Sequence, residues 1–456
     1  MSQKEQALMM RDMPIPPLII KMAIPSVIGM LVTTIYNLAD TYFVNFLGLS
    51  AVAAVGVNGS LDQIIMMAGS LFAVGSASYV SRLLGMGRKD KADEVLSTAF
   101  FTAFFVGMLI TIFGFLFMTP LVRLLGATPS CEAYSIQYAS YILYAAPFMA
   151  CNFVMNQVLR AEGSSIRSMF GMAFGGILNC VLDPIFIFGF DLGVAGASMA
   201  TALSKLVTFC ILISPYLRGK TLLRISFRKI RYELRTCQEV VSVGSSSLFR
   251  AAFAILAAML LNHSAGAISD ACLAAISATT RIMNVPFFTI LGFSQGFQPV
   301  AGFNWGAGLY DRVKESYYFS AKVSIIGSAL CAALLIFFAG PVITIFNTEG
   351  NPEMLELGKL CIRLQSLALP VHAWSAVVNM FCASLGRPKE AFLLATGRQG
   401  YCFLPLVFVL PPLVGAYGVV AVQAIADALL AVVTIPILIS VMRRVDRAAA
   451  QTQSAP

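Results

Sequence analysis

Long apolar segments constrain this chain more than any other feature of its sequence. A helix needs about 20 apolar residues to cross the hydrocarbon core of a bilayer, and only helices and closed barrels can satisfy their backbone polar groups there. Barrel strands would give weaker, alternating segments of about ten residues. We count twelve segments of helical length: 18–46, 51–83, 95–119, 132–159, 166–190, 194–216, 239–261, 271–303, 313–338, 354–381, 391–413 and 419–442.

Composition agrees with this interpretation. The 456 residues are 58% hydrophobic and 12% charged, which excludes a water-soluble globule. The sequence therefore predicts an all-α integral membrane protein with twelve transmembrane helices. Residues 1–11 are polar and the first apolar segment has the length of a true span, so we expect no cleaved signal peptide.

The net charge of +9 is distributed in a way that favours a membrane topology over a nucleic-acid partner. Lysine and arginine are concentrated in every second connection between the apolar segments. Because cytoplasmic loops carry this excess, we expect both termini to lie in the cytoplasm. Ten scattered cysteines and two distant histidines predict neither a metal site nor a cofactor.

The two halves of the chain repeat one another. The segment from Gly85 to Glu94 aligns with that from Gly306 to Glu315 at an offset of 221, and Gly196 aligns with Gly418 at 222. Six spans in each half give both halves the same orientation, related by a pseudo-two-fold axis along the membrane normal. We expect an N-terminal lobe (1–217), a basic cytoplasmic linker (218–238) and a C-terminal lobe (239–456).

Ionisable residues inside the spans mark the candidate site, because each costs at least ~3 kcal/mol to insert. Asp40 lies in the first span, and Asn179 and Asp183 lie one helical turn apart in the fifth. Thr201 in the sixth span lies at a compatible depth. Their equivalents in the second half are not acidic, so we expect the acids to be confined to the first half.

Carboxylate, amide and hydroxyl oxygens together suit a proton or a small cation such as Na⁺. Structural roles are the alternative for each residue. Tyr36 or Asn37 would satisfy Asp40, Asp183 would brace the helix before Pro184, and the remaining two would hold helices together. Candidates for the lining of a substrate cavity are Met66, Met155, Met283, Arg281, Asn284, Gln295 and His372.

Three motifs carry a family resemblance: Asn37-Leu-Ala-Asp40-Thr, the pair Arg160-Ala-Glu-Gly163 and Ala383-Ser-Leu-Gly386, and Gln295-Gly-Phe-Gln298-Pro299-Val-Ala-Gly-Phe-Asn304-Trp-Gly306-Ala-Gly308. The chain resembles the multidrug and toxic compound extrusion (MATE) family over essentially its whole length, in the bacterial branch with MepA-like and DinF-like pumps. This resemblance implies antiport of organic, often cationic, drugs against H⁺ or Na⁺ in a bacterial cytoplasmic membrane. It also assigns ion coupling to Asp40, Asn179, Asp183 and Thr201.

Two other functions compete with drug efflux. A flippase for lipid-linked oligosaccharides would need a strongly cationic cavity, whereas the spans hold few basic residues, chiefly Arg250 and Arg281. A membrane-embedded enzyme would need a nucleophile, a metal or an acid/base set, and the short outer loops offer none. We therefore expect a transporter of small organic molecules rather than an enzyme, with no cofactor, ATPase subunit or nucleic-acid partner.

Overall fold

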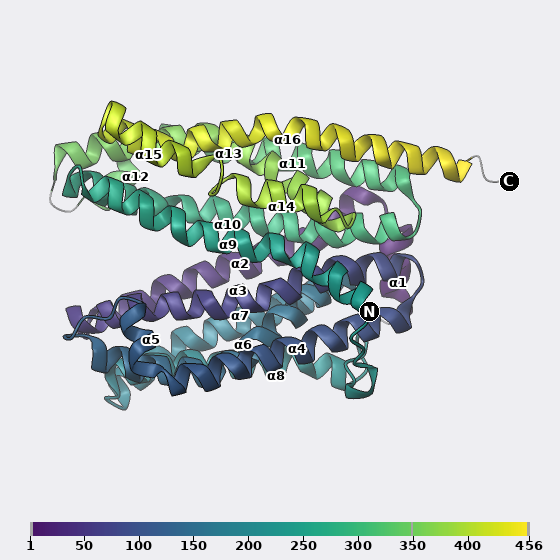
Figure 1. The fold of residues 1–456 in the computed structure, drawn as a ribbon, viewed down its shortest axis with the longest axis horizontal. Helices are drawn as coiled ribbons and strands as arrows, with labels where there is room; N and C mark the ends of the chain where they lie inside the picture. Colours follow the sequence, from purple (N-terminus) through teal and green to yellow (C-terminus); the bar gives the residue numbers. More distant parts are fainter. Residues whose placement is uncertain (1–2, 348–349, 454–456) are drawn as a thin grey trace.

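A computed structural model describes residues 3–347 and 350–453, and every regular element within these ranges is a helix. The predicted all-helical membrane fold is confirmed. Eleven of the described helices are long and apolar enough to cross a membrane. Figure 1 shows the long helices running side by side along one direction, as a bundle of spans would.

The first group of long helices comprises α2 (Ile15–Asn45), α3 (Leu49–Gly85), α4 (Lys89–Leu116), α6 (Glu132–Ala161), α7 (Ser165–Pro184) and α8 (Gly193–Leu217). The second group comprises α9 (Leu234–Gly266), α10 (Asp270–Gly306), α11 (Tyr310–Phe337), α13 (Pro352–Ser384) and α16 (Ala416–Gln453). Five short elements precede or connect the long helices: α1 (Gln3–Asp12), α5 (Met118–Leu124), η1 (Ile185–Gly189), η2 (Phe227–Lys229) and α12 (Ala339–Thr344).

The predicted span 391–413 is not one helix. It is divided into α14 (Pro388–Gly397) and α15 (Phe403–Val414), and the residues between them form turns. Gly397 and Gly400 disfavour a continuous helix, and Arg398 between them turns toward α16, where it meets Asp427. A broken helix is tolerated at membrane depth where its backbone is buried in protein.

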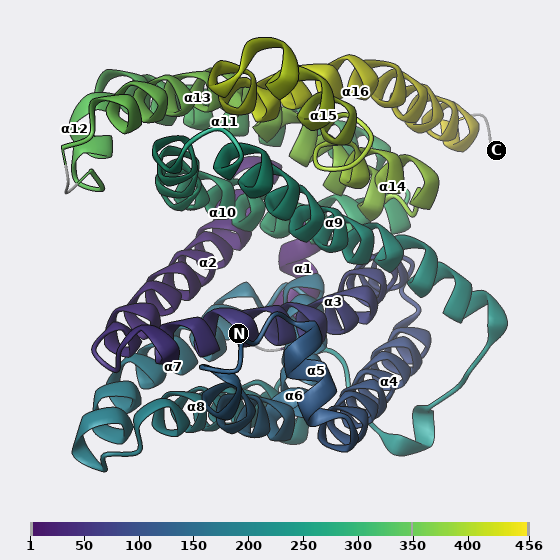
Figure 2. The same ribbon diagram turned by 60° about the vertical axis from the view of Figure 1, so that its left-hand side comes forward.

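The two groups meet where α2 and α3 cross α9 and α10 (Figure 2). Glycines allow the backbones to touch there: a Cβ added at Gly75 would lie 2.0 Å from the Val240 carbonyl oxygen, and one at Gly244 would lie 1.8 Å from that of Leu71. Small residues at helix crossings favour such close packing in membranes. This junction lies toward the ends of the helices that carry the basic connections, and Arg82 adds an ion pair to Glu239 across it at 2.9 Å.

The connection between α8 and α9 is fastened to the first group of helices. The backbone N–H of Leu223 donates to Glu162 at 3.2 Å, and that of Arg224 donates to Asp93 at 2.8 Å. Lys229 forms an ion pair with Asp93 at 2.6 Å. These contacts make the basic connection part of the first half's surface.

Candidate functional site

The predicted coupling residues of the first half form one cluster. Asn179 and Asp183 share a face of α7, and Asn179 Nδ2 donates to Asp183 Oδ1 at 3.1 Å. The same amide nitrogen lies 3.3 Å from the hydroxyl oxygen of Thr201 on α8. Asp40 on α2 interacts electrostatically with Asp183. Three helices therefore bring the predicted residues together.

Several oxygens of this cluster have no hydrogen-bond donor. Asp183 and Asn179 are buried, with 0% and 2% of their surface exposed. The unpaired buried oxygens are Oδ1 of Asp40, Oδ1 of Asp62, Oδ1 of Asn179 and Oδ2 of Asp183. Burying an acceptor without a partner costs about 1–3 kcal/mol, and more for a charged one. A bound proton or small cation would remove that cost.

A third carboxylate and a lysine, neither among the predicted site residues, belong to the cluster. Asp62 on α3 and Lys205 on α8 both interact electrostatically with Asp40. Lys205 Nζ donates to the Tyr36 hydroxyl at 2.8 Å, so Tyr36 serves the lysine, while its neighbour Asn37 is exposed on α2. Both charges interrupt apolar segments, which is the signal that identified Asp40.

The three carboxylates of the cluster differ in burial. No group of three His, Cys, Asp or Glu side chains among residues 3–347 and 350–453 is placed to hold a metal ion. Asp40 and Asp62 are half-buried, whereas Asp183 is fully buried. The arrangement suits a proton, or a Na⁺ ion that also draws on amide and hydroxyl oxygens.

The second half also buries a carboxylate, so the prediction that acids are confined to the first half is wrong. Asp427 on α16 is 3% exposed. Arg398, at the break between α14 and α15, approaches both its oxygens, with Nε 2.7 Å from Oδ1 and Nη2 3.4 Å from Oδ2. His372 Nδ1 on α13 lies 3.8 Å from Oδ1. Arg250 on α9 interacts electrostatically with Arg398 and His372.

The other predicted cavity residues lie in different environments. Met155 and Met283 are completely buried within apolar clusters, while Met66 on α3 is half-buried. Arg281 is exposed on α10, and Asn284 one turn later is half-buried. Gln295 is buried near the crossing of the two groups, beside Gln157, Arg160 and Gln298.

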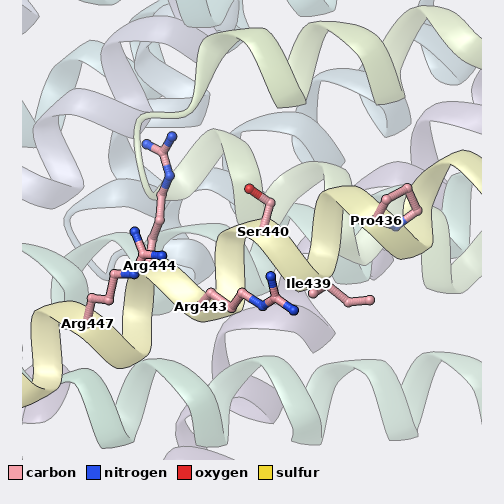
Figure 3. Close-up of a pocket in the computed structure, with 6 residues that line it drawn as sticks. All are labelled: Pro436, Ile439, Ser440, Arg443, Arg444 and Arg447. Atoms are coloured by element: carbon pink, nitrogen blue, oxygen red, sulfur yellow. The ribbon is translucent and has the colours of Figure 1, made fainter.

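A pocket of about 410 Å³ lies away from both charged clusters, along the C-terminal part of α16 (Figure 3). Its lining is Pro436, Ile439, Ser440, Arg443, Arg444 and Arg447. The pocket straddles the end of the predicted span 419–442: Pro436, Ile439 and Ser440 lie within that span, and the three arginines follow it. It is a surface feature of the chain end rather than part of the candidate site.

The family model MatE matches the chain twice, over residues 25–185 and again over 247–409. The chain belongs to the MatE family. The double match follows the internal repeat, because each half is recognised separately at nearly the same offset. The resemblance predicted from the three sequence motifs is thus confirmed.

Curated relatives and a solved structure match nearly the whole chain. The multidrug export protein MepA of Staphylococcus saprophyticus is 25% identical over 410 residues, 90% of each chain. MepA of Staphylococcus aureus is 25% identical over 430 residues, 94% of each chain. A structure titled as the outward-facing conformation of a multidrug resistance MATE family transporter has a TM-score of 0.90 at 25% identity, covering 97% of this chain and 98% of that one.

Proposed function

We propose that this chain is a multidrug efflux transporter that exports organic compounds and is driven by an ion bound in its first half. The observation that carries the proposal is the cluster of unpaired oxygens on Asp40, Asp62, Asn179 and Asp183. Buried charges are expensive in a membrane and mark ion pathways. The export function is supported by the MepA relatives, which are named as multidrug export proteins.

The orientation follows from the basic connections. We place both termini and the linker 218–238 in the cytoplasm, because loops rich in lysine and arginine stay on that side. The two groups of helices meet near this end, through Gly75 and Gly244. In our proposal they act as lobes that rock about the junction, and the conformation described here is outward-facing.

The mechanism requires the ion to favour one conformation. Without it, like-charged carboxylates repel one another and their unpaired oxygens lack donors. Binding a proton or Na⁺ removes both penalties, and a lobe arrangement that encloses the site then becomes more stable. A ligand shifts an equilibrium only through such a difference in affinity between two states. Release of the ion to the cytoplasm would then let the lobes return to their first arrangement and carry the next compound.

The test uses purified protein in liposomes preloaded with ethidium, under an imposed pH gradient and, separately, an imposed Na⁺ gradient. We expect one gradient to drive dye movement, and both Asp40→Asn and Asp183→Asn to abolish that movement while retaining dye binding. Asp90→Asn is the matched control, because the Asp90 side chain is 98% exposed. Normal gradient-driven movement in both cluster variants would refute the coupling site.

A further inference from the structure

One side of α16 carries exposed apolar side chains along the predicted span 419–442. Leu429, Val432, Pro436 and Ile439 are all exposed and lie three or four residues apart, so they share one side of the helix. Figures 1 and 2 both show α16 at the edge of the bundle. Because an apolar face of a span that no protein covers is covered by lipid tails, this side of α16 faces the bilayer.

Three arginines continue the same side of the helix beyond the span. Arg443, Arg444 and Arg447 follow Ser440 at intervals of three, four and seven residues, which keeps them on its side of α16. Figure 3 shows the Arg443 side chain extending along the helix toward Ile439. The pocket that these residues line has a volume of about 410 Å³, which lies within the range of small-molecule sites.

The positive charge of this pocket has no counter-charge in the protein. No ion pair among residues 3–347 and 350–453 includes Arg443, Arg444 or Arg447. Asp446, the acid nearest to them in sequence, is paired with Lys314 of α11 at 2.5 Å. Guanidinium groups match the geometry of a phosphate, to which each can donate two parallel hydrogen bonds.

The depth of the pocket distinguishes a lipid from a soluble anion. Ile439 lies within the span, and Arg443 follows it by four residues, or about 6 Å along the helix axis. The headgroup layer on each side of a bilayer is similarly thin, about 5–8 Å. A molecule that fills the pocket must therefore be apolar at one end and anionic at the other, as a phospholipid is and a free phosphate is not.

We propose that this pocket binds an anionic phospholipid, with the phosphate on the three arginines and the Ser440 hydroxyl and an acyl chain along Ile439. In our proposed orientation the pocket lies on the cytoplasmic side, the leaflet that is rich in anionic lipids. The site is separate from the ion-coupling cluster, so its test does not depend on export.

Native mass spectrometry of the purified protein in detergent tests the proposal, because it counts bound lipids. The probes are dioleoylphosphatidylglycerol, which is anionic, and dioleoylphosphatidylcholine, which has no net charge. We expect one molecule of the anionic lipid to bind at least about tenfold more tightly, since each arginine near an anionic charge contributes about fivefold in affinity. Glycerophosphoglycerol, the anionic headgroup without acyl chains, should bind at least about tenfold more weakly than the whole lipid.

Variants locate the bound lipid. Arg443→Gln, Arg444→Gln and Arg447→Gln should each weaken binding of the anionic lipid about fivefold, and the triple variant should weaken it at least about fiftyfold. Binding of phosphatidylcholine should stay within about twofold. The corresponding triple lysine variant keeps the charge and should retain most of the preference for the anionic lipid.

A charge-matched control separates a site from general attraction to a basic surface. Arg218, Arg228 and Arg235 are exposed in and beside the linker, on the same side of the membrane in our proposed orientation. Replacing all three by glutamine removes the same charge as the triple variant of the pocket. We expect this control to change the affinity for phosphatidylglycerol by less than about twofold.

Three results would overturn the proposal. Equal affinity for the two lipids would remove the charge preference, and equal weakening by the two triple glutamine variants would leave only general attraction. Binding of glycerophosphoglycerol as tight as that of the whole lipid would identify a site for soluble anions. All three arginines are exposed, so unfolding temperatures in detergent should match the wild type. If the triple glutamine variant nevertheless fails to fold, the three single variants decide.

Discussion

The two halves hold buried charge in opposite ways. In the first, Asp40 and Asp183 keep oxygens that no donor satisfies, and Lys205 binds Tyr36 rather than a carboxylate. In the second, Asp427 and Arg398 satisfy one another through two contacts, at 2.7 and 3.4 Å. Similar scaffolds thus carry an unsatisfied cluster and a largely satisfied one. This contrast supports our proposal that the first cluster gains an ion, and it predicts that the Asp427–Arg398 pair stabilises the fold.

The largest expected contrast is in protein stability, between the substitutions of Asp427 and Asp183. Asp427→Asn should destabilise the protein by about 3 kcal/mol, because it leaves Arg398 buried near Arg250 without a counter-charge. Asp183→Asn should be neutral or stabilising, because it removes one of several like charges and retains an acceptor for Asn179. Thermal unfolding in detergent measures both.

Equal destabilisation by the two substitutions would remove the distinction between a satisfied and an unsatisfied cluster. Arg398→Lys provides the control, since it keeps the positive charge but loses the bidentate geometry. Arg398→Lys should therefore destabilise the protein, but by less than Asp427→Asn does.

A second contrast concerns Glu162, which follows α6 outside the spans and whose equivalent in the repeat is Leu385. Burial raises the pKa of Glu162 to about 8, against the opposing effects of the Leu223 N–H and of Arg167. The folded state therefore holds this proton more tightly than the unfolded state, where the pKa is near 4.5. Its contribution to stability is full below about pH 4.5 and is lost as the pH rises through about 8.

The measurement is the unfolding temperature as a function of pH, from about pH 4.5 to about pH 8. The wild type should lose stability by at most about 1.4 kcal/mol per pH unit across the window, and Glu162→Gln should flatten that slope while its amide oxygen still accepts from Leu223. Glu356→Gln, at an exposed position of α13, should leave the slope unchanged. A slope that persists in Glu162→Gln would assign the titration to other groups.

Most of the fold follows from the sequence, because length and hydrophobicity alone define a span. The break at Arg398 does not follow from them, since an average over an apolar window is insensitive to Gly397 and Gly400. The turn becomes apparent only when Asp427 is placed beside the arginine. The internal repeat predicts how the two halves are related, because the offset between matching positions stays nearly constant even where the residues themselves differ.

The site could be predicted only in part. Asp40, Asn179, Asp183 and Thr201 follow from type and spacing, and the structure brings them together, although their role in coupling stays a prediction. Asp62, Lys205 and Asp427 were equally visible as charges in apolar segments. Their partners lie on other helices, so the sequence does not show which of these charges meet. The distances between helices depend on rotation and tilt, which the sequence does not encode locally.

Asp62 gives the next contrast. Asp62→Asn should weaken binding of the coupling ion about tenfold, because affinity in oxygen-rich sites depends on the number of charged ligands. Asp427→Asn should leave that affinity unchanged, since its carboxylate belongs to the other half. Isothermal titration with Na⁺, or proton release followed with a pH electrode, measures either ion. An effect confined to Asp427→Asn would place the ion site in the second half.

The smallest expected effect is a gain in affinity for the coupling ion rather than a loss. Lys205 lies beside Asp40 and Asp62 without forming an ion pair within the described residues, so its ammonium competes with an incoming cation. Lys205→Met should therefore tighten ion binding by about threefold, less than the loss in Asp62→Asn because the lysine contributes no oxygen. Lys322→Met, at an exposed position of α11, controls for the loss of a lysine. Weaker ion binding in Lys205→Met would instead mean that the lysine, through Tyr36, holds α2 and α8 in the geometry that the ion requires.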